Sequence, residues 1–194
     1  MAVIMIKSVL LFVFIAASLV TGKRVYNMKM GKDPDKFYWE NCNKTVTPLA
    51  FRVLSLSPNP IKYGQDLLIT AELDVTKIIG TTHSLKAEVT ANLVVGDQKY
   101  SMCDYKPEYC HIQDVCKAIT DLKLPCPAIV KKKGSNCECP LKPNTYSVKQ
   151  IKIPVPNPGV QLEGHYQVQV NLSEKNEQVG CFFVNFCLGS CSSD

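Results

Sequence analysis

The stretch Leu67-Leu68-Ile69-Thr70-Ala71-Glu72-Leu73-Asp74-Val75 has an apolar side chain at every odd position. Its even positions from Thr70 onward are polar, so one face of the segment is apolar and the other is polar. A period of two residues is typical of a β-strand that buries one face, as strands in antiparallel sheets do. The same alternation returns at Leu85–Val95 and at Tyr166–Leu172. These three segments predict long antiparallel strands.

Shorter apolar segments, separated by turn residues, complete a strand-rich pattern. They are Leu49–Leu56, Tyr100–Cys103, Tyr146–Val155 and Val179–Leu188. The third changes phase between Val148 and Ile151, which predicts a bulge or bend. One further set of apolar residues has helical spacing and predicts a short helix: Ile112, Val115, Ile119 and Leu122. Roughly seven or eight strands and one helix indicate an all-β fold, an antiparallel β-sandwich or β-cup.

The first residues have the pattern of a secretory signal peptide. Lys7 precedes an apolar run, Val9–Val20, that is about half the length needed to span a bilayer. We expect cleavage after Gly22, which makes residues 1–22 a signal peptide, residues 23–36 a flexible N-terminal arm and residues 37–194 one exported domain. An uncleaved membrane anchor is the alternative.

All ten cysteines follow the predicted signal peptide, and an even number in an exported chain indicates disulfides. A zinc site is the alternative, because several cysteines are crowded between positions 103 and 139. The sequence lacks the matched Cys-x-x-Cys pairs of zinc ribbons, so we expect a disulfide-braced domain without a metal or other cofactor. The cysteines are Cys42, Cys103, Cys110, Cys116, Cys126, Cys137, Cys139, Cys181, Cys187 and Cys191.

Charge and motifs exclude several classes of function. Loss of one lysine with residues 1–22 leaves 21 basic and 17 acidic residues, a net charge of +4. This small, dispersed charge is not that of a nucleic-acid-binding protein, although it permits weak attraction to an anionic lipid surface. The three histidines, His83, His111 and His165, belong to no catalytic or metal-binding motif, so we expect no catalytic centre.

Apolar residues make up 46% of the chain, and Cys181–Leu188 is apolar on nearly both faces. This surplus fits an ordinary closed core or two sheets held apart around a lipid. Composition alone favours the closed core. Disulfides around the rim of a cup would offset the van der Waals contacts that an unfilled cavity loses. At the surface, sequons at Asn43 and Asn171 predict N-glycosylation.

Cysteine-centred motifs follow one another in order from Phe37 to about Leu188. They are Phe37-Tyr38-Trp39-Glu40-Asn41-Cys42, Cys103-Asp104-Tyr105 with Cys110 and Cys116, Pro125-Cys126-Pro127, Cys137-Glu138-Cys139-Pro140 with Thr145-Tyr146-Ser147, and Gly164-His165-Tyr166 with Gly180-Cys181. With these motifs the sequence resembles the ganglioside activator family, within the ML lipid-recognition group. The resemblance covers most of the predicted domain.

The resemblance implies a β-cup with an apolar lipid cavity. A protein of this family lifts a glycosphingolipid or other membrane lipid from a membrane and presents its headgroup to a hydrolase, a lysosomal beta-hexosaminidase in the ganglioside activators. The implied destination is the lysosomal lumen or the outside of the cell. Cys187 and Cys191 have no counterpart in the family, and we expect them to pair with each other. The implied disulfides are Cys42–Cys181, Cys103–Cys110, Cys116–Cys139 and Cys126–Cys137.

On this hypothesis the inward residues of the alternating strands bind lipid tails. They are Leu67, Ile69, Leu73, Val89, Leu93, Ile153, Val168, Val170, Phe182, Val184 and Phe186. Apolar loop residues are expected to contact the membrane transiently: Ile78, Ile79, Val160 and Leu162. For the turn at Ile78 and Ile79, burial against the domain is an equal alternative. The alternatives are a secreted surface-binding or defence protein with a closed core, and a small lipid hydrolase that uses His111 or His165.

Overall fold

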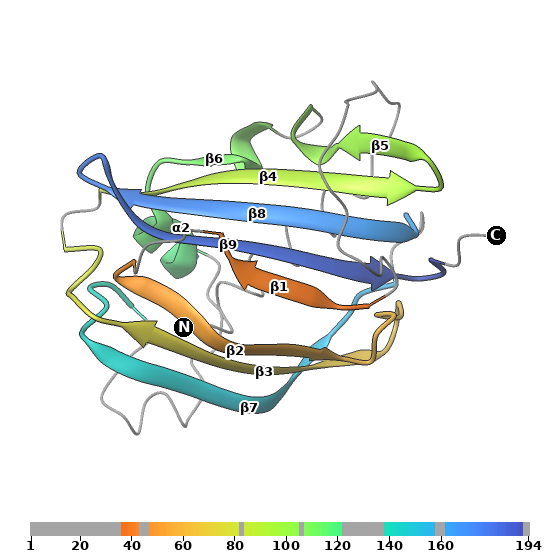
Figure 1. The fold of residues 1–194 in the computed structure, drawn as a ribbon, viewed down its shortest axis with the longest axis horizontal. Helices are drawn as coiled ribbons and strands as arrows, with labels where there is room; N and C mark the ends of the chain where they lie inside the picture. The colour runs from red at the N-terminus through yellow and green to blue at the C-terminus, as the bar shows by residue number, and fades with distance from the viewer. Residues whose placement is uncertain are drawn as a thin grey trace.

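The computed structural model describes residues 36–42, 47–81, 84–104, 107–121, 138–157 and 162–191. These residues form two antiparallel sheets, two short 3-10 helices and one α-helix (Figure 1). The elements are β1 (Tyr38–Asn41), β2 (Leu49–Ser57), β3 (Asp66–Val75), β4 (Leu85–Val95), β5 (Gln98–Ser101), η1 (Met102–Asp104), η2 (Pro107–Tyr109), β6 (His111–Ile112), α2 (Val115–Asp121), β7 (Asn144–Pro154), β8 (Gly164–Glu174) and β9 (Glu177–Leu188).

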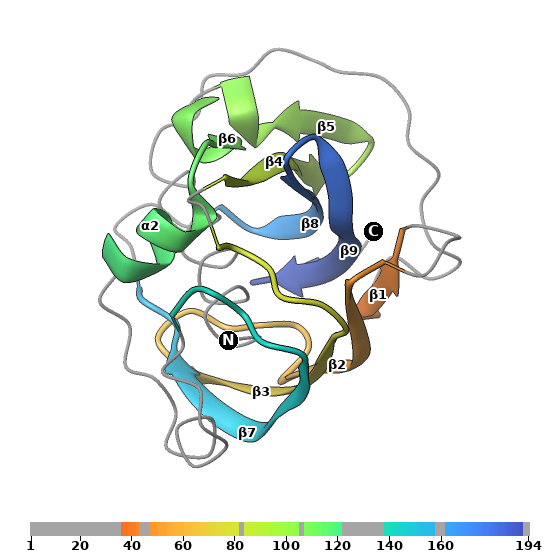
Figure 2. The same cartoon turned by 90° about the vertical axis from the view of Figure 1, so that its left-hand side faces the viewer.

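The two sheets lie face to face as two layers (Figure 2). One has the strand order β1-β9-β8-β4-β5, with β6 also paired to β4, and the other has the order β2-β3-β7. Every pairing between neighbouring strands in these sheets is antiparallel. Seen along the layers, α2 lies at one side of the sandwich, and β1 and β2 lie at the other.

Alternation in the sequence becomes alternation in burial. In β3 the odd positions from Leu67 to Val75 are buried, and the positions between them are only partly buried. The buried face of β3 packs with buried faces of the opposite sheet, and together they form a single core. The prediction of an all-β, antiparallel, disulfide-braced sandwich with one short helix is therefore confirmed.

The predicted irregularity in the segment 146–155 is a β-bulge. The register of β3 against β7 shifts between the pairs Ile69–Ile151 and Ala71–Val148. Gln150 lies in the bulge with a φ of 49°, and its N–H donates to the Thr70 hydroxyl at 3.1 Å. The extra residue returns Ile151 and Ile153 to the side of the sheet on which Tyr146 and Val148 are buried, which explains the change of phase in the sequence.

The helix is shorter than the sequence predicts. It begins directly after Asp114, whose carboxylate accepts the N–H of Lys117 at 2.9 Å, as an N-cap residue does. Ile112 was wrongly assigned to it, because Ile112 lies in β6 and pairs with Ala87 of β4. Leu122 lies outside the described residues. Within the described ranges no helix is both long and apolar enough to cross a membrane.

Hydrogen bonds join the two sheets along the side formed by β1, β2 and β9. The side-chain amide of Asn41 donates to the Phe51 carbonyl at 2.8 Å and accepts the Phe51 N–H at 3.0 Å, as a neighbouring strand would. Farther along, the N–H of Ile61 donates to the Cys187 carbonyl, and the Ile61 carbonyl accepts the N–H of Gly189, both at 2.8 Å. The sheets are thus attached along this side.

Four disulfides brace the described residues, each with the partner expected above. One joins the end of β1 to β9, one joins α2 to the segment before β7, and two close short loops. The implied bridge between Cys126 and Cys137 lies outside the described residues. The four pairs are Cys42–Cys181, Cys116–Cys139, Cys103–Cys110 and Cys187–Cys191.

Candidate functional site

The side chains predicted to bind lipid tails all belong to the apolar core between the sheets or lie against it. Nine of them are at most 6% exposed, and Val89 and Val184 are half-buried. They come from both layers, so the predicted inward face is right for each strand. We call this set the inner wall: Leu67, Ile69, Leu73, Val89, Leu93, Ile153, Val168, Val170, Phe182, Val184 and Phe186.

Three aromatic rings absent from the predicted set belong to or pack against the same core, and we include them in the inner wall: Trp39, Phe51 and Tyr166. Phe51 of β2 meets Phe182 edge-on at a centroid distance of 5.0 Å and Trp39 at 6.3 Å, so its ring connects β1, β2 and β9. Tyr166 of β8 stacks on Phe186 at 5.5 Å with an interplanar angle of 9°. Tyr166 alternates in step with Val168 and Val170, which were predicted to point inward. The sequence pattern therefore indicated the burial of Tyr166 as well.

The tyrosines of the core have hydrogen-bond partners for their hydroxyl groups. Tyr146 donates to the Lys142 carbonyl at 2.8 Å, and Tyr166 donates to the Leu162 carbonyl at 2.9 Å. The Leu162 carbonyl also accepts the Tyr63 hydroxyl, at 2.9 Å. Buried polar groups paired in this way add no unsatisfied donor to an apolar surface. The inner wall therefore remains apolar in spite of its tyrosines.

Burial raises the pKa of Tyr166 far above its ordinary value, and the neighbouring Tyr63 adds to the shift. Above about pH 10 a tyrosine of the unfolded chain ionises while Tyr166 of the folded protein stays protonated. Stability is therefore expected to be full below that pH and to fall above it. Tyr166→Phe should lower the free energy of unfolding by about 1 kcal/mol at neutral pH. In alkali, the stability of this variant should fall less steeply with pH than that of the unmodified protein. Urea unfolding between pH 7 and pH 11 measures both, and an alkaline slope equal to that of the unmodified protein contradicts this assignment.

The predicted membrane contacts lie at opposite ends of the sandwich. Ile78 follows β3 and is 52% exposed, whereas Leu162 precedes β8 and is half-buried. The 11 residues of β8 separate these ends by roughly 35 Å. Ile79 was wrongly assigned to the membrane, because it is 1% exposed and exchanges two backbone hydrogen bonds with Leu141. Val160 lies outside the described residues.

Two of the three histidines lie within the described residues, and both are away from the inner wall. His111 is exposed and contacts the Glu88 carboxylate. His165 donates from Nε2 to the Cys191 carbonyl at 3.1 Å. His83 is not described. Among the described residues no group of three or more His, Cys, Asp or Glu side chains could hold a metal ion.

Of the two predicted glycosylation sites, the structure describes one. Asn171 lies in β8 opposite Cys181 of β9 and is half-buried. Its Oδ1 accepts a hydrogen bond from the Gln178 side chain at 3.3 Å. Asn43 lies outside the described residues, and glycosylation of either asparagine stays a prediction.

Comparison with known proteins gives one family and a set of similar chains. The ganglioside GM2 activator of Macaca fascicularis is 28% identical over 158 residues, which cover 75% of this chain and 79% of the relative. The ganglioside GM2 activator of Mus musculus is 28% identical over 152 residues, 75% of this chain and 78% of the relative.

Solved structures are more distant. A Niemann-Pick type C2 protein from Japanese carpenter ant is 14% identical, with a TM-score of 0.40 over 78% of this chain and 99% of that one. Chicken MD-1 complexed with lipid IVa is 13% identical, with a TM-score of 0.37 over 81% of this chain and 93% of that one. The family model of the ML domain matches residues 36–188. Because that match covers most of its length, the chain belongs to the ML domain family.

Proposed function

We propose that this protein is a non-enzymatic lipid carrier that holds the apolar tails of a membrane lipid between its two sheets. The inner wall is the observation that carries the proposal, since it draws apolar side chains from both layers. The similarity to ganglioside GM2 activators over most of both chains supports the same function. The lipid class proposed is glycosphingolipid, with other membrane lipids as further ligands.

The chemistry of the inner wall suits reversible exchange of lipids. Each methylene group that leaves water for an apolar surface gains about 0.8 kcal/mol, so a lipid tail does not stay in solution. A bilayer and an apolar wall offer the tail similar surroundings, so the free energy of the tail changes little when it moves from one to the other. Tyr146 and Tyr166 do not disturb this balance, because their hydroxyl groups donate to backbone carbonyls.

The polar headgroup of a lipid held in this way stays outside the sandwich, where a second protein can reach it. We therefore propose presentation of the headgroup to a soluble hydrolase, with a lysosomal beta-hexosaminidase as the first candidate. The carrier needs no nucleophile of its own for this role. Its proposed location is the lysosomal lumen or the outside of the cell, in agreement with its disulfides.

Membrane contact is proposed at the end of the sandwich that holds Leu162. Val95, at the end of β4, is 47% exposed, and its side chain lies beside Gly164 at the start of β8. Leu162 precedes that glycine by two residues. Two aliphatic residues, Val95 at the end of β4 and Leu162 just before β8, therefore lie at this end of the sandwich. At the other end Ile78 remains exposed, but its neighbour Ile79 is buried.

Native mass spectrometry of the glycan-trimmed protein, followed by lipid extraction and a liposome-to-liposome transfer assay, tests the proposal. Co-purified lipid, and transfer without hydrolysis, are the expected results, and the headgroups found narrow the choice of hydrolase. An empty protein that transfers no lipid contradicts the carrier function and favours a surface-binding protein with a closed core.

Two neighbouring residues of β8 provide a matched pair of variants. Val170 belongs to the inner wall and is 6% exposed, whereas Gln169 points to the opposite face. If lipid fills the space between the sheets, Val170→Trp should fold and carry several-fold less lipid, while Gln169→Trp carries the normal amount. In a closed core the larger ring at position 170 would instead lower stability by about 1–3 kcal/mol.

A further inference from the structure

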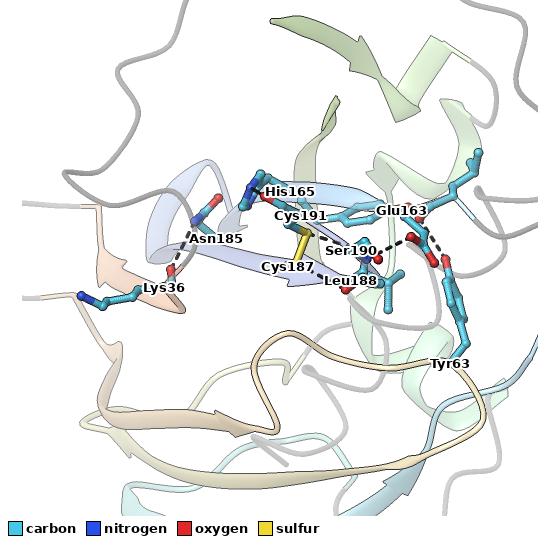
Figure 3. Close-up of a disulfide and its surroundings, with 12 residues drawn as sticks. Lys36, Tyr63, Glu163, His165, Asn185, Cys187, Leu188, Ser190 and Cys191 are labelled. Carbon is cyan, nitrogen blue, oxygen red and sulfur yellow. Dashed lines mark hydrogen bonds between the residues drawn. A yellow bond between two sulfur atoms is a disulfide. The ribbon is translucent and has the colours of Figure 1, made fainter. Parts of the chain in front are cut away.

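The end of β9 folds back as a small hook that the Cys187–Cys191 disulfide closes (Figure 3). Three backbone groups of the hook bond to other parts of the chain. The N–H of Gly189 donates to the Ile61 carbonyl at 2.8 Å, and the N–H of Ser190 donates to the Glu163 carboxylate at 3.0 Å. The Cys191 carbonyl accepts from His165. The hook thus ties the loop after β2 to the start of β8.

Glu163 is the side chain through which the hook reaches the segment before β8. Its carboxylate lies over Gly189, which has a φ of 77°. The positive φ favours glycine at this position, and a Cβ atom there would lie 2.4 Å from the Glu163 Cγ, so an alanine would displace the Glu163 side chain. The hook and Glu163 therefore form one closely fitted unit.

From Glu163 the connection continues to the inner wall. The preceding residue is Leu162, whose carbonyl accepts the hydroxyl groups of Tyr63 and Tyr166. Tyr166 is fully buried and stacks on Phe186. A fixed position of Glu163 therefore fixes the Leu162 carbonyl, and this carbonyl holds a tyrosine that belongs to the inner wall.

We propose that Glu163 and the disulfide-closed hook are positioning residues for lipid exchange: they hold Leu162 in the orientation in which it meets the membrane. This inference rests on the proposed carrier function and names a determinant of its rate. The hydrogen bond between Ser190 and Glu163 involves no residue of the predicted lipid-binding set. Loss of the hook should consequently slow transfer while leaving the affinity for lipid nearly unchanged.

The expected size follows from conformational entropy. Without the hook, the backbone of Glu163 must be ordered anew at each encounter with a membrane. Ordering one backbone residue corresponds to a rate effect of about ten-fold. Glu163→Ala should therefore transfer lipid between vesicles about ten-fold more slowly, and so should the double variant Cys187→Ser with Cys191→Ser.

Two variants control this experiment. Glu163→Gln keeps an acceptor oxygen for the Ser190 N–H and should transfer within two-fold of the unmodified protein. Glu174 lies at the opposite end of β8, where its carboxylate accepts the N–H groups of Gly80 and Thr81 at 3.0 and 3.2 Å. Glu174→Ala removes the same kind of bond from the other end of the sandwich, so its transfer rate should change less than two-fold.

The measurement is transfer of a fluorescent glycosphingolipid between phosphatidylcholine vesicles, with equilibrium binding of the same lipid measured in parallel. Slow transfer by Glu163→Ala with normal binding, and rescue by Glu163→Gln, support the inference. Equal rates for Glu163→Ala and the unmodified protein overturn it, as does an equal slowing by Glu174→Ala, which would indicate general destabilisation. Should the unmodified protein neither bind nor transfer lipid, the carrier function itself fails, and this result is distinct from both.

A double-mutant cycle examines the route through Leu162. If the hook acts on Tyr166 through that carbonyl, the effects of Glu163→Ala and Tyr166→Phe on the transfer rate should be less than additive. Strictly additive effects would overturn this route. Should the cysteine double variant fail to fold, Gly189→Ala displaces the Glu163 side chain instead and should give the same slow transfer.

Discussion

Replacing Cys42 and Cys181 together by alanine should lower the free energy of unfolding by about 4–5 kcal/mol. The two residues are 139 positions apart, so their bond restricts nearly the whole unfolded domain, and the entropy of loop closure grows with loop length. Such a loss is comparable with the entire stability of many domains. Urea unfolding under oxidising conditions measures the effect.

The disulfide between Cys103 and Cys110 is the matched control. Its two residues are only 7 positions apart, and the same relation predicts a loss of about 2 kcal/mol when both are replaced by alanine. A greater loss from the short loop than from the long one would show that contacts in the folded state, rather than loop closure, decide how much each bridge contributes.

Gly80→Ala should destabilise the domain by about 2–5 kcal/mol. Gly80 has a φ of 80°, a conformation that costs an alanine about 1–2 kcal/mol. An added Cβ would also lie 2.7 Å from the Cys116 sulfur and 2.8 Å from the Cys139 sulfur, and crowding of this kind costs about 1–3 kcal/mol more. Thermal or urea unfolding of the purified variant measures the sum.

Gly96→Ala separates the two causes. Gly96 also has a positive φ, of 54°, but a Cβ there would have no atom within 4 Å. Gly96→Ala should therefore lower the free energy of unfolding only by the conformational cost of the positive φ, about 1–2 kcal/mol. Equal losses at the two positions would show that the bridge between Cys116 and Cys139 moves aside without cost and does not fix the loop after β3.

The inner wall could be predicted from the sequence because its signal is local. In a strand the pleat sends successive side chains to opposite faces, so the run from Leu67 to Val75 states which residues point inward. The burial of Leu67, Ile69 and Leu73 follows from that pattern alone. Even the bulge at Gln150 left a trace, since one extra residue shifts the period-two pattern.

Where neighbours decide a residue's surroundings, the sequence pattern failed. Ile78 and Ile79 are adjacent and chemically identical, yet one is 52% exposed and the other 1%, because the backbone of Ile79 pairs with Leu141. Ile112 fitted a helical period, but β4 offered it a strand partner. In both cases a contact with a distant segment outweighs the local preference.

Alternation along the chain therefore encodes the strands and their inward faces, and the family resemblance implied the partners of most of the cysteines. Only the tertiary structure shows that Ile78 and Leu162 lie at opposite ends of β8, and that the hook after β9 holds Glu163. The bond between Tyr63 and the Leu162 carbonyl joins residues 99 positions apart. No periodicity spans such a distance, because alternation records how each strand meets its own two faces and carries no information about which loops meet at the ends.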